Sequence, residues 1–233
     1  MNKDDVRKGI GKSWELLKSL SLAEVFSNSL PMNASDDFIS TAFDKQVTYE
    51  ELYLTGLRHS DYNILLKDFS YFQYSLTEDD HTRYAYYPNP FLGASQDAIS
   101  ELDELRVYVE EGAISVEEYL IKAAELRRSQ HPPLLRYENA PRQYAEFRHP
   151  CSHFHLGHHD NNRWPIQRSL TPIAFTMLVS RHFYSDIWFG TASIDLFGKS
   201  QSPDDFLTRA KSDCRILGDD LFSKRESLLF FFG

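Results

Sequence analysis

Two runs of aromatic residues joined by a short acidic turn constrain the fold of this chain most. The first run spans residues 68–76, the second spans 83–87, and Pro88 ends the second run. Flat rings fit the pleated surface of a sheet, and a short polar turn between two such runs is typical of a β-hairpin. The chain has 17 Phe and 13 Tyr, so we expect a sheet to organise its core.

A second sheet-like region is expected in residues 133–166, with strand candidates at 134–138 and 151–156. Apolar spacing and capping residues predict helices around the sheet, at 4–28, 33–44, 48–59, 94–111, 115–128, 172–182 and 202–217. The apolar tail at 228–232 is expected to dock on the core or, alternatively, to contact a partner. No repeat or linker divides the chain, so the sequence predicts one α+β domain over 1–233, an antiparallel sheet built from two hairpins with helices packed around it.

The sequence favours a protein that is soluble in the cytoplasm. No stretch approaches the roughly 20 apolar residues of a membrane helix, and the N-terminus lacks the apolar region of a secretory signal. The two cysteines, Cys151 and Cys214, cannot build a disulfide framework, which fits a reducing compartment.

Charge is distributed unevenly. The net charge of −9 disfavours an extended surface for nucleic acid. The segment from Arg136 to Arg168, however, holds five arginines and three acids, a net charge of +2 that leaves −11 for the rest. The sequence therefore predicts a local cationic site in an acidic protein.

Histidines concentrate in that segment, where five of the nine lie between His149 and His159. Alternate residues of a strand share a face, so one face is expected to carry imidazole and thiol groups and the other to be apolar. The first face would comprise His149, Cys151, His153 and His155. A turn at Gly157 would return His158 or His159 to the same face.

Two chemistries suit such a row. Paired histidines with neighbouring arginines can act as acid and base on a phosphodiester, and RNA carries its own nucleophile in the 2′-hydroxyl. Alternatively, His153, His155 and His158, with Cys151 or Asp160, could ligate zinc and activate a water. A solvated polar loop without a chemical role is the third interpretation.

Arginines and a tyrosine are the expected partners of the row. A hairpin between the two strands would place Arg136 or Tyr137 beside His153 or His155. Arg163 and Arg168 could approach from the other side, although each arginine could instead form a surface ion pair. A phosphate-binding glycine loop, a Gly-x-Ser-x-Gly elbow and a Cys-x-x-Cys pair are absent, which disfavours triphosphate hydrolysis, serine-hydrolase chemistry and zinc fingers.

The motifs together resemble a bacterial family catalogued only as a domain of unknown function. The resemblance covers most of the chain, its name implies no activity, and its most specific part is His149-Pro-Cys-Ser-His-Phe-His-Leu-Gly157. A weaker resemblance, over 136–155, is to TumE-like toxins of toxin–antitoxin pairs, which carry Arg-Tyr-Asp-Asn-Ala-Pro-His-His and a later His-x-His. Here Glu138 replaces the Asp of the motif, and Arg142-Gln143 replace its two histidines. These departures put the toxin chemistry in doubt.

The leading hypothesis is an RNase-like effector of a defence or toxin-like system that needs no cofactor. His153, His155 and Tyr137 would be catalytic, and four further residues would bind substrate: Arg136, Arg163, Arg168 and His149. The alternatives are a zinc-dependent hydrolase at the same histidines and a non-catalytic protein that binds a partner from the same operon.

Overall fold

The computed structural model describes residues 2–77, 80–91, 101, 104–109, 111–115, 118–119, 121–122, 133–158 and 162–230. The chain divides into two compact units, each built from separate segments. The first unit comprises Met1–Asn33, Tyr62–Tyr87 and Pro133–Gly233, and the second comprises Ala34–Asp61 and Pro88–Pro132. The single domain expected over 1–233 stays a prediction.

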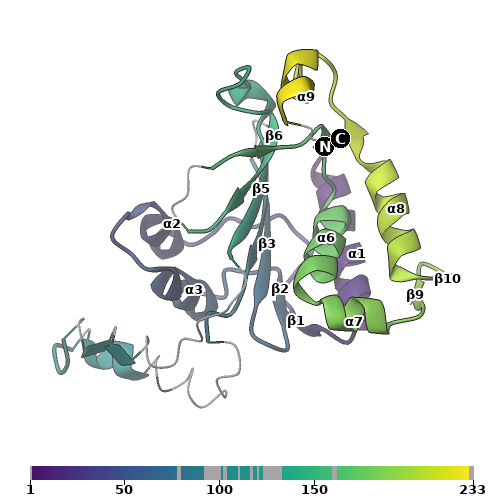
Figure 1. Cartoon of the computed structure of the whole chain (residues 1–233). Coiled ribbons are helices and arrows are strands. Elements are labelled where there is room, and N and C mark those ends of the chain that lie inside the picture. The colour runs from purple at the N-terminus through teal and green to yellow at the C-terminus, as the bar shows by residue number, and fades with distance from the viewer. Residues whose placement is uncertain are drawn as a thin grey trace. The chain divides into compact units, whose positions relative to one another are not determined.

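A seven-stranded antiparallel sheet organises the first unit (Figure 1). Its strands neighbour one another in chain order: β1 (Ala23–Phe26), β2 (Ile64–Leu66), β3 (Tyr71–Leu76), β4 (Thr82–Tyr87), β5 (Leu135–Asn139), β6 (Ser152–Leu156) and β7 (Trp164–Pro165). The α+β class is confirmed, and the two expected strand pairs form, β3 with β4 and β5 with β6. The sheet is larger than two hairpins because β1, β2 and β7 extend it.

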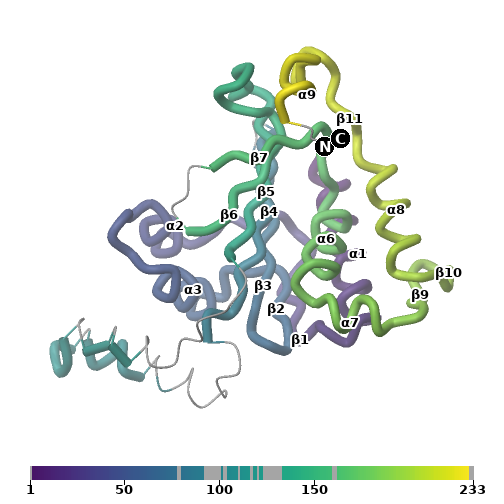
Figure 2. Tube along the Cα trace, viewed as in Figure 1, coloured from purple at the N-terminus to yellow at the C-terminus, as the bar shows by residue number. Residues whose placement is uncertain are grey.

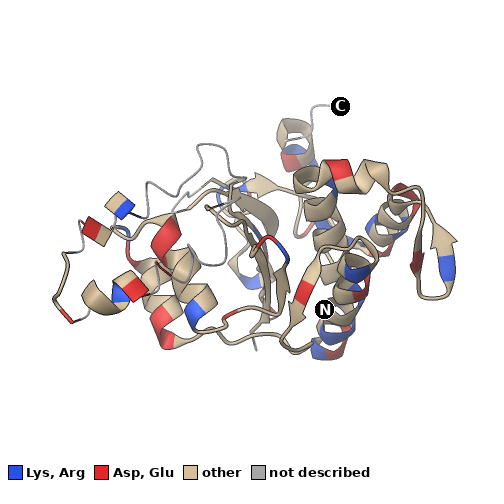
Figure 3. Ribbon diagram, turned by 90° about the horizontal axis from the view of Figure 1, so that it is seen from below, with Lys and Arg blue, Asp and Glu red and all other residues tan. Residues whose placement is uncertain are grey.

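Helices and short strand pairs complete this unit, and Figure 2 shows their order along the chain. The helices are α1 (Lys3–Ser19), α6 (Pro172–Phe183), α7 (Ser185–Gly190), α8 (Pro203–Asp213), α9 (Lys224–Phe230) and the short 3-10 helix η1 (Pro141–Gln143). β8 (Arg168–Ser169) pairs with β11 (Arg215–Ile216), and β9 (Ile194–Leu196) pairs with β10 (Lys199–Gln201). Helix α1 carries charges of both signs, as Figure 3 shows near the N-terminus.

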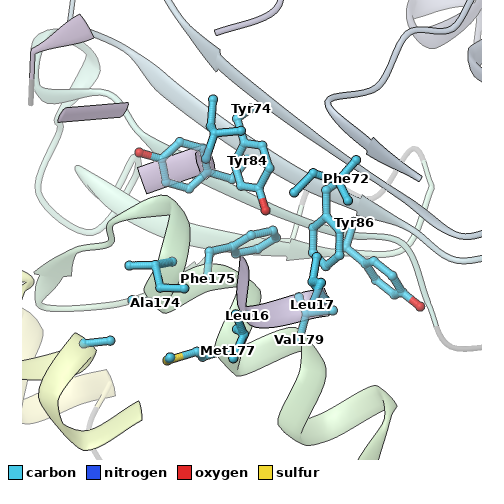
Figure 4. Packing of buried hydrophobic residues seen from close by; sticks show 14 of the residues in the cluster. Leu16, Leu17, Phe72, Tyr74, Tyr84, Tyr86, Ala174, Phe175, Met177 and Val179 are labelled. Carbon is cyan, nitrogen blue, oxygen red and sulfur yellow. The ribbon is translucent and has the colours of Figure 1, made fainter. Parts of the chain in front are cut away.

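The core lies between one face of the sheet and helices α1 and α6. Figure 4 shows Phe175 of α6 directed at the rings of Tyr74 and Tyr84. The tyrosine hydroxyls in this core need partners, and Tyr74 forms a 2.6 Å hydrogen bond with Thr176. Because successive strand residues point to opposite faces, the side chains between these aromatic residues lie on the other face of the sheet.

The first helix is shorter than its apolar spacing suggested. It was expected to reach residue 28, but it ends at Ser19, and Ser21 adopts a left-handed conformation with φ of 59°. Residues 23–26 then form edge strand β1, and Phe26 stacks on Trp14 at 5.1 Å. The apolar spacing assigned Phe26 to the helix, because strand β1 folds back and packs Phe26 against the apolar side of α1.

The second unit contains α2 (Asp36–Phe43) and α3 (Tyr49–Arg58). Ser35 and Thr48 cap them, accepting hydrogen bonds from Phe38 N and Glu51 N, so both expected helices are confirmed. The expected helices at 94–111 and 115–128 lie partly outside the described residues.

Toward the C-terminus, α6 agrees with the expected helix, whereas α8 ends at Asp213, before β11. The expected apolar tail begins inside α9, where Leu228 is 83% exposed, and 231–233 lie outside the described residues. In the described part of the chain, no helix has the length and apolar character needed to cross a membrane.

Candidate metal centre on β5 and β6

Two histidines of β6 point away from the core and converge. Phe154, between them, packs against the core, whereas His153 and His155 lie on the opposite face. They are 0% and 6% exposed, and their Nε2 atoms are 3.0 Å apart. The alternation expected from the sequence therefore brings the two rings together.

The ring of His153 is held by the chain just before the strand. Its Nδ1 lies 2.8 Å from the carbonyl oxygen of Pro150. A carbonyl can only accept, so Nδ1 donates its proton and Nε2 keeps a lone pair directed at His155. Metal-binding histidines are commonly oriented by such a hydrogen bond.

Glu138 of β5 completes the cluster. It faces His153 in the register of the two strands, and its carboxylate and the two imidazoles offer ligand atoms within 4.8 Å of one another. In the sequence, Glu138 stands out only as a departure from the toxin motif. Its position two residues after Arg136 would place both on one strand face, which is the signal that could have identified it.

Two residues hold the carboxylate of Glu138: His81, just before β4, and Arg83, within β4. Arg83 Nε donates to Glu138 Oε1 at 3.1 Å, and His81 Nε2 lies 3.5 Å from Oε2. Burial disfavours the charged form of Glu138, but His81, Arg83 and His155 outweigh it and lower the pKa. The cluster therefore contains a carboxylate that is ionised at neutral pH.

Burial favours the neutral form of two imidazoles, those of His153 and His149. It lowers the pKa of His153 to about 4, with His155 adding to the effect. It also lowers the pKa of His149, assisted by the positive charge of Arg163. Neutral imidazole is the form that ligates a metal, whereas a general acid needs the protonated form.

Arg136 and His149 border the cluster as expected substrate-binding residues. Arg136 pairs with His155 across the strands, and the ring of His149 lies 5.2 Å from that of His153. Among the residues that the structure describes, the buried Arg136 Nε and His149 Nδ1 have no hydrogen-bond partner. Arg163 is exposed and close enough to act on His149.

The segment before β6 is anchored by a buried carboxylate. Glu226 of α9 is 0% exposed and accepts hydrogen bonds from Tyr144 Oη at 2.8 Å and Phe147 N at 3.1 Å. Within the same segment, His149 N donates to Ala145 O at 2.8 Å. The position of His149 therefore depends on α9, a helix distant in the sequence.

Tyr137 lies on the other face of the sheet, which corrects the placement expected for it beside the histidines. It pairs with Phe154, belongs to the core, and forms hydrogen bonds with Ser152 Oγ at 3.0 Å and Leu170 N at 2.8 Å. Burial raises the pKa of Tyr137 to about 12. The strand register selects Arg136, not Tyr137, as the neighbour of the histidines.

Three other expected residues are not in the cluster. Arg168 donates through Nη1 to the carbonyl oxygens of Lys211 and Cys214, at the end of α8. Cys151 precedes the strand and packs with Leu217 and Phe222, because Pro150 delays regular pairing. Within the described residues, His158 is not in the three-residue cluster, while His159 and Asp160 lie outside them.

Comparison with known proteins gives one family. Residues 20–217 match the model of a family described as an uncharacterized conserved protein (DUF2290). No curated protein and no solved structure matches the chain. The weaker resemblance to TumE-like toxins is not confirmed by these comparisons.

Proposed function

Because the chain belongs to the DUF2290 family, whose description states no activity, we propose its function from the site itself: a divalent metal centre at Glu138, His153 and His155 that hydrolyses a phosphodiester. The observation that carries the proposal is the convergence of three buried ligand atoms within 4.8 Å. Burying a carboxylate and two imidazoles together is costly, and metal coordination is one of the few ways to offset that cost.

Two histidines and a glutamate form a zinc-binding set that leaves a position open for water. A zinc ion lowers the pKa of its bound water to about 7, which supplies hydroxide at neutral pH. Zinc also needs no redox partner, so hydrolysis requires nothing beyond water and substrate. We therefore take zinc as the metal and hydrolysis as the reaction class.

The chain supports these ligands from outside. The carbonyl of Pro150 fixes the tautomer of His153, and the guanidinium of Arg83 fixes the carboxylate of Glu138. Outer partners of this kind orient metal ligands and contribute to metal affinity. Their presence on both types of ligand favours a metal centre over a fortuitous cluster.

The substrate class follows from the cationic groups beside the cluster. Arg136 Nε and His149 Nδ1 are buried nitrogens without a partner among the described residues, so a bound substrate can satisfy them. A guanidinium group suits the oxygens of a phosphate, and Arg163 adds positive charge near His149. RNA is the phosphodiester that we propose first.

Metal-independent acid–base chemistry is the second candidate, favoured by the 3.0 Å distance between the two Nε2 atoms. It requires one imidazole to be protonated at neutral pH. Burial lowers the pKa of His153 to about 4, which disfavours His153 as that protonated group. The metal centre is therefore the better supported of the two.

A cleavage assay separates these proposals. Untagged protein is stripped with a chelator, reloaded with Zn²⁺ or Mn²⁺, and tested on labelled single-stranded RNA, with DNA of the same sequence in parallel. We expect metal to restore RNA cleavage and Glu138→Gln and His155→Ala to reduce it at least about 100-fold. His182→Ala, a histidine exposed on α6, is the matched control and should retain full activity.

Cleavage that survives metal removal would support the acid–base mechanism instead. Cleavage of DNA alone would replace RNA as the substrate and keep the metal centre. Metal-loaded, folded protein that cleaves neither polymer would contradict the proposed activity.

A further inference from the structure

A cavity on the core side of β6 is separate from the metal centre. Its volume is about 510 Å³, within the range of small-molecule pockets. It lies between α6, α8 and the chain from β7 to β8, and Figure 1 shows α6 and α8 beside each other. Phe154 of β6 contributes to its wall, so one strand carries this cavity on one face and the histidines on the other.

The wall of the cavity is largely apolar. Six of its eleven lining residues have apolar side chains: Phe154, Ile166, Leu170, Ala174, Leu178 and Leu207. Most of them are only partly buried although they pack against the core. Such side chains retain apolar surface that a ligand with an apolar body could cover.

The charged part of the wall is entirely basic. Arg168, Arg181 and Lys211 line the cavity with His182, and none of the described residues that line it is acidic. The cavity therefore has three permanent cations and no acid among its described lining residues, in a chain with a net charge of −9. Its charge complements an anion.

Arg168 is the best placed of these cations. Its Nη1 donates to Lys211 O at 3.2 Å and Cys214 O at 3.0 Å, which fixes the guanidinium at the end of α8. Nη2 and Nε can still donate to a ligand in the fork geometry that suits a carboxylate. Arg181 is already engaged, since Asp204 lies 3.2 Å from it and it lies over the ring of Phe189.

We infer that this cavity binds an amphipathic organic anion, a carboxylate with an apolar tail. The tail covers the apolar wall, and the carboxylate lies between Arg168 and Lys211. The site is independent of the proposed metal centre, and it accounts for Arg168, which the sequence pointed to but the histidine cluster does not use.

Calorimetric titration of the full chain with decanoate tests this inference, with decylamine as a probe of the same length and opposite charge. We expect decanoate to bind and decylamine not to bind. Lys211→Glu should weaken decanoate binding about five-fold or more, because it removes an attraction and adds a repulsion. Lys224→Glu, the same change on exposed α9, should weaken it less than two-fold.

A second variant tests the apolar part. Leu178→Trp fills the cavity and should abolish decanoate binding, while cleavage activity and the melting temperature without ligand are retained. Decylamine binding as tightly as decanoate, equal effects of the two lysine variants, or unchanged binding to Leu178→Trp would overturn the inference. So would the absence of binding at millimolar decanoate.

Discussion

The Nε2 atoms of His153 and His155 lie 3.0 Å apart, on the sheet face opposite the aromatic core. Two imidazoles this close cannot both carry a proton on these atoms, so at least one lone pair faces the other ring. The carboxylate of Glu138 lies in the same cluster and is held ionised. This arrangement of a negative charge and imidazole lone pairs is what a divalent cation requires.

The stability of the metal-free protein should depend on pH through His153. Its pKa is about 4 in the folded chain, against about 6.5 for an unperturbed histidine, with burial as the main cause. Because the folded value is the lower one, the unfolded chain binds the proton first, and stability is lost as pH falls from 6.5 toward 4. The loss should reach about 2–3 kcal/mol by pH 4.5.

Urea unfolding at pH 7.5 and 4.5 measures this loss. The variant His153→Asn should lack most of it, whereas His182→Ala should show the same loss as the natural chain. Equal pH dependence in His153→Asn and the natural chain would show that His153 is not held neutral.

Tyr137→Phe should lower stability without changing activity. The hydroxyl bonds Ser152 Oγ and Leu170 N in the core, and its removal leaves the latter donor without its acceptor. The free energy of unfolding should fall by about 1–3 kcal/mol. Cleavage per folded molecule should remain, because the ring is on the core face of the sheet. If Tyr137→Phe kept full stability but lost activity, Tyr137 would have a catalytic role and this account would be wrong.

Two glycines of α1 should respond to alanine in opposite directions. A Cβ at Gly9 would lie 2.7 Å from Pro172 Cδ, so Gly9→Ala should force α1 from α6 and cost about 1–3 kcal/mol. Gly11 has nothing within 4 Å of the same position, and Gly11→Ala should stabilise the helix by up to about 1 kcal/mol. Thermal melts of both variants measure these two changes in stability. Equal tolerance at both positions would mean that α1 and α6 do not pack closely there.

Local signals explain which parts of the fold could be predicted from the sequence. Ser35 and Thr48 marked helix starts, and the aromatic runs marked the hairpin of β3 and β4. Each of these features depends on residues close together in the chain. Strand β1 was wrongly included in a helix, because its pairing with β2 joins segments about 40 residues apart.

The sequence was enough to predict the position of the candidate site but not its full set of residues. Alternation within β6 was enough to place His153 and His155 on one face. The register of the two strands decides which residues of β5 lie beside these histidines. A shift of one residue would place Tyr137 on the histidine face instead of Arg136 and Glu138. Glu138 shares a strand face with Arg136 because it lies two residues further on, but its role as a ligand depends on contacts with β4 and β6, which are distant in the sequence.

The metal content of the protein tests the central claim most directly. Untagged protein, purified without chelator, is analysed for zinc, manganese and iron by mass spectrometry, with circular dichroism as the check of folding. We predict about one zinc per chain for the natural protein and for His182→Ala, and a large loss for His155→Ala and Glu138→Ala. Folded natural protein with less than about 0.2 metal per chain, and no uptake when zinc is added, would contradict the account.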